Sequence, residues 1–291
     1  MQLGKRAVWA PTDGMNADDL AAFAQRVEAW GYSALWIPDA MGRDPMVAAS
    51  WMLANTTNLV LATGIANIYS RDVSAMKAAQ VALNEQSGGR FLLGLGVSHK
   101  PFVEGVREHD YLAPVPTMRN YLEGLKEHQF MGQQAPEEPS TVIAALGPKM
   151  LELARTHAQG AHPYLVPPEH TVQAKDILGN DALLCVEQKV LFETDATKAR
   201  ATARQNLGIY LTMPNYCNNL RRCGFDDEDF ENNGSDRLID TIIAWGDEDT
   251  IAARIKAHED AGATQVCVQA LNPTGSAVPD ERILEILAPG K

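Results

Sequence analysis

Short stretches of apolar residues recur along the chain, and longer stretches with the spacing of amphipathic helices lie between them. At several joins a glycine ends the helix and turns the chain, as in Trp30-Gly31 and Ala261-Gly262. Most of the apolar stretches do not alternate with polar residues, which indicates strands buried on both faces of a parallel sheet. Eight strands are predicted on this basis: Ala7–Ala10, Ala34–Ile37, Leu59–Gly64, Phe91–Leu93, Thr141–Leu146, Ala161–Val166, Ala182–Val186 and Gln265–Ala270.

The stretches between the strands predict eight helices: Asp18–Trp30, Pro45–Asn55, Ser74–Gln86, Thr117–Met131, Pro148–His157, Pro168–Leu178, Asp195–Tyr210 and Asp249–Ala261. Thr117, which follows Pro116, is expected to cap its helix. The acidic residues from Asp247 to Asp249 place negative charge where the dipole of the last helix is positive. Alternating strands and helices favour an α/β fold, a (β/α)8 TIM barrel, and a doubly wound open sheet is the alternative.

No linker interrupts this alternation, so we expect a single barrel domain over residues 1–291. Residues 215–246 are the irregular part of the chain. Asn-rich turns and the acidic run from Asp226 to Asp229 separate helical pieces there, just before the last strand. We expect this segment to be an insertion or a lid.

Composition and charge narrow the class of partner. Hydrophobic residues make up 45% and charged residues 21% of the 291, as in ordinary globular proteins. The net charge of -12, without any run of Lys or Arg, argues against nucleic acid and anionic membrane as partners. The expected partner is a small molecule. No apolar run reaches the ~18 residues of a membrane span, and no secretory signal is recognisable near the N-terminus. The four cysteines lack zinc or disulfide spacing, which favours reduced thiols and a cytoplasmic location.

The residues that follow the strands are the candidates for chemistry, because barrel active sites form at the carboxyl ends of the strands. In this sequence Asp39 could bond a cofactor ring or only cap the next turn. His99 could move a proton near neutral pH, or be a hydrogen-bonded histidine without a catalytic role. His157 and His162 flank a helix-to-strand turn, where we expect a surface or capping role. The other candidates at strand ends are Trp9, Thr63, Gly64, Ile65, Gly96 and Ser98.

A candidate anion site follows the fifth strand. Gly147 precedes Pro148, so the amides of Lys149 and Met150 are left unpaired at a positive helix end, and Lys149 adds a charge. An ordinary helix that starts at a proline is the alternative. Gly94-Leu95-Gly96 lacks the third glycine of a dinucleotide motif, and the sequence has no Walker motif, nucleophile elbow or metal-binding histidine cluster. We therefore expect no metal site.

Two blocks of the sequence carry a family resemblance. Leu61–Arg71 (LATGIANIYSR), followed by Gln86–Gly96 (QSGGRFLLGLG), resembles the bacterial luciferase-like oxidoreductase superfamily. Ala144–Met150 (AALGPKM), with Leu153-Ala154, is similar to the branch that uses the deazaflavin coenzyme F420 instead of FMN. The likeness extends from Trp36 to Ala263. It implies a cytoplasmic oxidoreductase that transfers a hydride between F420 and a small organic substrate.

The resemblance also implies roles for individual residues. The coenzyme phosphate is expected on Gly147, Pro148, Lys149 and Met150, and the ring against a bulge with a cis peptide between Gly64 and Ile65. Trp9, Asp39, Thr63, Gly96 and Ser98 complete the expected cofactor contacts, and His99 and Asp39 are the expected catalytic residues. Members that oxidise sugar phosphates have a histidine directly after the aspartate of strand two. Here that residue is Ala40, so their substrate and mechanism do not transfer.

Three further expectations follow. An FMN-dependent luciferase-like monooxygenase would share the barrel and the phosphate loop, so it is the alternative enzyme. A barrel that only binds the coenzyme, without catalysis, is the alternative outside the enzymes. A homodimer is expected, because this superfamily commonly pairs its barrels and because Pro45–Asn55 carries more apolar surface than one buried stripe needs.

Overall fold

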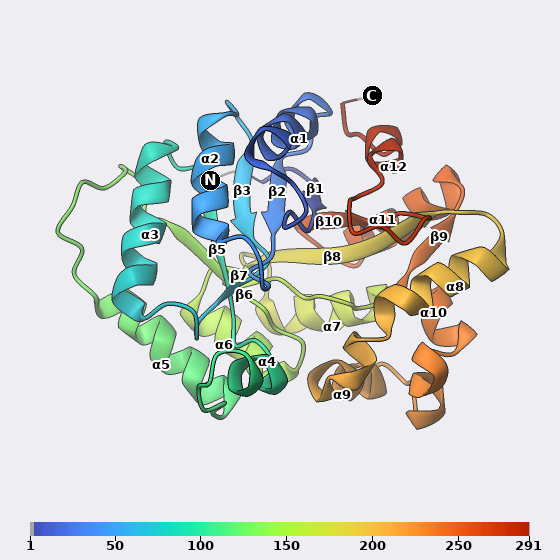
Figure 1. Ribbon diagram of the computed structural model, residues 1–291. Helices are drawn as coiled ribbons and strands as arrows, with labels where there is room; N and C mark the ends of the chain where they lie inside the picture. Colours follow the sequence, from blue (N-terminus) through green and yellow to red (C-terminus); the bar gives the residue numbers. More distant parts are fainter. Residues whose placement is uncertain (1–2, 291) are drawn as a thin grey trace.

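Parallel strands close into a barrel in the computed structural model, which describes residues 3–290 (Figure 1). The strand order is β1-β2-β3-β5-β6-β7-β8, and β10 pairs with both β8 and β1. Cys267, for example, is in register with Glu187 on one side and Ala7 on the other. The predicted eight-stranded barrel is thereby confirmed. Its strands are β1 (Arg6–Trp9), β2 (Ala34–Ile37), β3 (Val60–Thr63), β5 (Phe91–Gly96), β6 (Ser140–Ile143), β7 (Gly160–Ala161), β8 (Leu183–Phe192) and β10 (Gln265–Ala270).

Helices surround the barrel, and the eight predicted ones are present with ends shifted by a few residues (Figure 1). Asp247 caps the last of these, where its side chain accepts from the amide of Thr250. The prediction for Thr117 is wrong. That helix begins at Pro114, and the Thr117 hydroxyl donates to the carbonyl of Ala113 from inside the first turn. The eight are α1 (Ala17–Ala29), α2 (Pro45–Ala54), α3 (Val73–Gln86), α5 (Pro114–Glu127), α6 (Pro148–His157), α7 (Pro168–Leu178), α8 (Ala196–Leu207) and α11 (Glu248–Asp260).

Several short elements were not predicted. The two-residue strand β4 (Ala66–Asn67) pairs with the end of β5 beside the bulge that follows β3. The helix α4 (Lys100–Gly105) follows β5, and α12 (Glu281–Ile286) lies near the C-terminus. No helix among residues 3–290 is long and apolar enough to cross a membrane.

Two barrel strands differ in length from their prediction. β7 ends at Ala161 instead of continuing to Val166, because Pro163 has no amide hydrogen for a strand partner and Leu165 has a positive φ of 61°. β8 instead continues to Phe192, well past the predicted end at Val186. The polar residues that seemed to end it, Glu187, Gln188 and Lys189, are all buried.

The segment before the last strand folds as helical pieces with one more strand. Residues 215–246, called the insert below, hold most of α9 (Pro214–Arg222), η2 (Asp227–Asn233), α10 (Asp236–Ile242) and β9 (Ala244–Gly246). The short turn η1 (Tyr210–Thr212) leads into them, and β9 pairs in parallel with the end of β8. Most of the insert's buried apolar residues belong to a hydrophobic cluster separate from the main core, with Leu207, Leu220, Leu238 and Ile239 among its members. In Figure 1 these helices stand to one side of the barrel, next to α8.

Candidate active site

A cleft of about 980 Å³ opens among the loops at the carboxyl ends of the strands. Six of the residues predicted for the site line it, namely Trp9, Asp39, Gly64, Ile65, Ser98 and His99. The predicted phosphate residues 147–150 are not part of this lining, but Ala144, three residues before them, is. The barrel therefore brings half of the twelve candidate residues together around one cavity.

The floor of the cleft is built around Gly64. The Gly64–Ile65 peptide is cis, as the family resemblance led us to expect. The Trp9 indole donates to the Gly64 carbonyl over 3.1 Å. A Cβ at Gly64 would lie only 2.5 Å from that indole nitrogen, so a side chain has no room here. The floor is consequently a bare stretch of backbone supported by an aromatic ring.

Two predicted cofactor residues shape this floor from behind. Thr63 is fully buried, and its hydroxyl donates to the Gly94 carbonyl and accepts from the Gly94 amide. At Gly96 a Cβ would lie 2.4 Å from the Ile65 side chain, so the glycine leaves the space that Ile65 occupies. Neither Thr63 nor Gly96 is among the residues that line the cleft. They position the bulge on which the floor depends.

His162 is a site residue that the sequence analysis missed. We predicted a surface or capping role, but the side chain is 2% exposed and lines the cleft. Its ring stacks on Trp36 with centroids 4.3 Å apart, and Nδ1 lies 2.7 Å from the Cys185 carbonyl oxygen. Burial lowers the pKa of His162 to about 4, so the ring is neutral at pH 7. Because a carbonyl only accepts, Nδ1 carries the proton and Nε2 the lone pair.

The free nitrogen of His162 lies directly under the floor. Nε2 has no hydrogen-bond partner within the described chain, and it would be 3.1 Å from a Cβ placed at Gly64. Buried polar atoms normally have a partner, so an unpaired one at a cleft suggests a group supplied by a ligand or water. The sequence showed only a histidine two residues after a glycine turn, which is too common a pattern to identify such a site.

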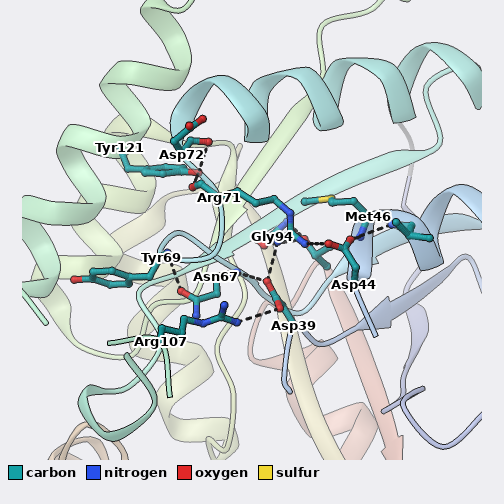
Figure 2. Close-up of polar contacts among 12 residues, drawn as sticks. Asp39, Asp44, Met46, Asn67, Tyr69, Arg71, Asp72, Gly94, Arg107 and Tyr121 are labelled. Atoms are coloured by element: carbon teal, nitrogen blue, oxygen red, sulfur yellow. Dashed lines mark hydrogen bonds and ion pairs between the residues drawn. The ribbon is translucent and has the colours of Figure 1, made fainter. Parts of the chain in front are cut away.

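Asp39 is held by two arginines (Figure 2). Its carboxylate accepts from the Asn67 amide over 3.1 Å and from Arg71 Nη1 over 3.0 Å, and Arg107 lies 3.8 Å away. Arg71 also pairs with Asp44, the cap of α2. With its oxygens engaged in this way, Asp39 connects the loops after β2 and β3. The contacts favour this positioning role over the predicted catalytic role.

His99 stands at the mouth of β5 and connects the barrel to the insert. Its Nδ1 lies 3.1 Å from the side-chain oxygen of Asn215, and its ring contacts that of Tyr216 with centroids 5.4 Å apart. Burial lowers the pKa of His99, while the contact with Asn215 acts in the opposite direction. The imidazole is therefore neutral at pH 7. Residues more than a hundred positions apart meet here, so the sequence could not reveal this pair.

A polar network inside the barrel reaches the cleft at the opposite wall. Lys189 and Glu187, both 1% exposed, point inward from β8. The Lys189 ammonium donates to the Tyr164 hydroxyl over 2.6 Å and to Gln269 over 2.8 Å. Tyr164 and Tyr210 line the cleft, and their hydroxyls are 2.9 Å apart. Glu and Lys two residues apart share one face of a strand, and this spacing was the available sequence evidence for the network.

The predicted anion site contains an arginine from the insert. Gly147 is the extended residue that precedes α6, and Pro148 occupies the first turn. The Met150 amide was predicted to be unpaired, but this is wrong, because it donates to the Gly147 carbonyl over 3.0 Å. A Cβ at Gly147 would lie 3.3 Å from Arg222 Nη2, which places a guanidinium beside the positive helix end. Lys149 is exposed in the same turn. Arg222 was not predicted, because it lies 75 residues further along the chain in the irregular segment.

Comparisons with known proteins agree with this geometry. The chain is 26% identical over 293 residues to the 5,10-methylenetetrahydromethanopterin reductase of Methanolobus tindarius, covering 85% of this chain and 88% of that protein. Among solved structures, the coenzyme F420 dependent tetrahydromethanopterin reductase from Methanopyrus kandleri matches with a TM-score of 0.78 at 18% identity, over 100% of this chain and 98% of the other. An F420-dependent secondary alcohol dehydrogenase in complex with an F420-acetone adduct matches with a TM-score of 0.72 at 13% identity, over 92% and 93%.

The two solved structures establish the fold, since their sequence identity to this chain is low. The family evidence comes from the sequence profile described as luciferase-like monooxygenase, which matches residues 1–265. That match includes the bulge at Gly64, the mouth of β5 and the start of α6. The chain therefore belongs to the luciferase-like monooxygenase family.

Proposed function

We propose that this protein is an oxidoreductase that transfers a hydride between coenzyme F420 and a small organic substrate bound in the cleft. One observation carries the proposal: a bare backbone floor at Gly64–Ile65 lies at the same barrel mouth as a helix start flanked by Arg222. A flat ring and a phosphate are the two parts of a deazaflavin coenzyme that need such places. The F420-dependent enzymes among the similar proteins support the choice of coenzyme.

The described residues fit the coenzyme at both places. The ring would lie against Gly64 and Ile65, where Trp9 supports the backbone and His162 Nε2 offers an unused lone pair. The phosphate would accept from the Lys149 amide at the start of α6, with the charges of Lys149 and Arg222 close by. When bound there, the deazaflavin supplies or accepts a hydride at its ring carbon C5.

The protein's own contribution is then alignment and exclusion of water. The aromatic side chains of Trp9, Tyr164 and Tyr216 line the cavity, and their rings contact one another through Tyr164. Such walls hold a substrate near the floor, and correct alignment of two reactants contributes several kcal/mol to a rate. We also propose that the insert acts as a lid, because Asn215 and Tyr216 reach the barrel mouth at His99.

Binding and redox spectroscopy test the coenzyme. The purified protein is titrated with F420 and with FMN, and the reduced F420 complex is then mixed with acetone or with methylenetetrahydromethanopterin. We expect tight F420 binding, oxidation of the bound coenzyme by one acceptor and no consumption of oxygen. The family description favours one alternative, an FMN monooxygenase. FMN binding with oxygen uptake driven by NAD(P)H would establish it, and F420 binding without hydride exchange would indicate a coenzyme-binding barrel.

Replacement of His99 distinguishes a binding role from acid–base catalysis. Because the ring is neutral and fixed by Asn215, we expect His99→Ala to weaken F420 affinity by roughly tenfold, about 1.4 kcal/mol. Turnover at saturating coenzyme should stay within about twofold of the wild type. Asn215→Ala, which frees the ring without removing it, should show a smaller change in the same direction. The opposite pattern, with turnover lowered by ~10²–10⁴ at unchanged affinity, would instead identify His99 as the acid–base group.

We propose a homodimer in which α2 contributes to the interface. Val47 and Trp51 on this helix are 66% and 44% exposed, and Met41 just before it is 70% exposed. The Trp51 indole donates to the Ala17 carbonyl, which fixes the ring at the surface. Light scattering at micromolar concentration should give a dimer mass, and Val47→Glu should give a monomer. Val172→Glu on α7, at a residue 47% exposed, should leave the dimer unchanged. A monomeric wild type would contradict the proposal.

A further inference from the structure

A line of polar contacts leads from the closed interior of the barrel to the cleft. Glu187 lies at the inner end, with a carboxylate oxygen 3.7 Å from Lys189 Nζ. The Lys189 ammonium donates to the Tyr164 hydroxyl over 2.6 Å. The Tyr164 hydroxyl lies 2.9 Å from that of Tyr210, and both rings line the cleft. The line thus has an ion pair at its buried end and two hydroxyls at its open end.

Packing does not explain why charged groups occupy this position. On the same inward face of β8, Cys185 packs in an apolar cluster with Trp36 and Leu92. The barrel interior can therefore be filled without charge. Burying an ion pair carries a desolvation penalty, and apolar residues of similar volume are often equally stable or more so. The Glu187 carboxylate is also incompletely bonded, since one of its oxygens has no hydrogen bond within the described chain.

The hydroxyl pair has the capacity to exchange a proton with a bound molecule. The Tyr164 hydroxyl accepts from Lys189, and its single proton can be donated either to the Gln269 side-chain oxygen, 3.0 Å away, or to Tyr210. When Tyr164 donates to Tyr210, the proton of Tyr210 is free for a bound molecule. Within residues 3–290, the hydroxyl of Tyr210 bonds Tyr164 alone, so it keeps capacity for one more partner. Burial raises the pKa of Tyr164, so this hydroxyl stays protonated at neutral pH. Tyr210 is therefore the end of the line that can serve a ligand.

We propose that Tyr210 is the catalytic residue that exchanges a proton with the substrate, and that Tyr164 and Lys189 are positioning residues that replace this proton. The inference rests on the proposed hydride transfer and adds the substrate class, a carbonyl or an imine. In the reducing direction the hydride from the reduced deazaflavin forms a C–H bond, and the π electron pair moves to oxygen or nitrogen. That atom takes the Tyr210 proton, Tyr210 takes the Tyr164 proton, and Tyr164 takes one from the Lys189 ammonium. The reverse sequence serves the oxidation of an alcohol or amine.

The other candidate groups near the cleft are less suited to this task. His99 is fixed by Asn215, and the carboxylate of Asp39 is engaged by Arg71. His162 carries no proton on its free nitrogen, since Nδ1 holds it against the Cys185 carbonyl. Lys189 Nζ, by contrast, donates to Tyr164 along the line, and Glu187 lies 3.7 Å from it inside the barrel. The interior line is therefore the proton source that the geometry supports best.

Removal of the terminal hydroxyl tests the proposal. With reduced F420 and acetone or methylenetetrahydromethanopterin, Tyr210→Phe should lower kcat by roughly a hundredfold, while KM and F420 affinity stay within about twofold. Tyr32→Phe is the matched control, because it also removes one buried tyrosine hydrogen bond, to the Leu284 carbonyl, outside the cleft. Unchanged kcat in Tyr210→Phe would overturn the proposal. If the wild-type protein does not bind F420, the proposed function itself is wrong. This outcome differs from unchanged kcat in Tyr210→Phe, which would overturn only the role of Tyr210.

A second readout needs neither coenzyme nor substrate. In protein labelled with ¹³C at the tyrosine ζ-carbon, Lys189→Met should shift the Tyr210 resonance, although the two residues share no hydrogen bond. The Tyr32 resonance should not move. Because Lys189→Met leaves Glu187 buried without its partner, the same spectrum is recorded for Lys189→Met with Glu187→Gln, and circular dichroism checks that both variants fold. If the Tyr210 resonance stays in place in the folded double variant, Lys189 is not coupled to Tyr210 through Tyr164. That result would overturn the relay.

Discussion

The Gly147→Asp protein should fold normally and lose tight coenzyme binding, with affinity lowered by a hundredfold or more, about 3 kcal/mol. The new carboxylate would repel a phosphate at the start of α6. It would also pair with Arg222, whose guanidinium lies 3.3 Å from the position of the added Cβ. A negative charge at a positive helix end is favourable for folding, so stability should be kept or slightly raised.

Comparison of two variants separates the effect of the added charge on coenzyme affinity from the effect of the added side-chain volume. F420 affinity is determined by fluorescence titration for Gly147→Asp and for Gly147→Asn, which has nearly the same size without the charge. We expect the asparagine variant to lose much less affinity than the aspartate variant. Equal affinity for wild type and a folded Gly147→Asp variant would show that the phosphate binds elsewhere.

Gly94→Ala should destabilise the whole barrel. A Cβ at Gly94 would lie 2.0 Å from the carbonyl oxygen of Thr63, which is backbone and cannot turn away, and 3.3 Å from the Trp36 ring. Thr63 and Trp36 are fully buried, so the strain has to be taken up by β3 or β5. Overpacking of this kind costs about 3 kcal/mol or more, which lowers Tm by roughly 6–9 °C.

Thermal unfolding followed by circular dichroism measures this effect. Gly14→Ala is the matched control, because nothing lies within 4 Å of a Cβ added there. Its Tm should equal that of the wild type within about one degree, since open surface sites usually change stability by less than 0.5 kcal/mol. A wild-type Tm for Gly94→Ala would show that β3 and β5 are not in tight contact at this point.

The barrel was predictable because its strands are buried on both faces and so form continuous apolar runs. The same rule explains the errors at β7 and β8. An apolar run continued through Tyr164 to Val166 although Pro163 cannot take part in a strand, so β7 was predicted too long. Glu187 broke the apolar run of β8, so that strand was predicted too short. An apolar run in a sequence indicates burial among apolar residues. A barrel interior can also bury charged residues, and such a run does not reveal them.

Site residues were predictable only where they lie in the sequence next to the carboxyl end of a predicted strand, since that end faces the barrel mouth. Trp9, Gly64 and His99 follow strands directly, and all three line the cleft. Arg222 lies in the irregular insert, and Tyr210 was predicted as the last residue of a helix but lies in the turn η1 that follows α8. The direction of both side chains depends on how these segments pack against the barrel, which is a tertiary property. The family resemblance supplied the cis peptide at Gly64, and no residue pattern alone would have done so.

The separate hydrophobic cluster of the insert has a consequence for how such proteins diverge. Leu220, Leu238 and Ile239 pack among themselves and with α8, so mutations there need no compensation in the main core. Tyr216 of the insert and three residues just before it, Ile209, Tyr210 and Met213, line one side of the cleft, while the floor and its supporting rings belong to the barrel. A lineage can therefore exchange this side for another by replacing one contiguous piece of gene. The coenzyme chemistry would be inherited unchanged, and only the choice of substrate would evolve.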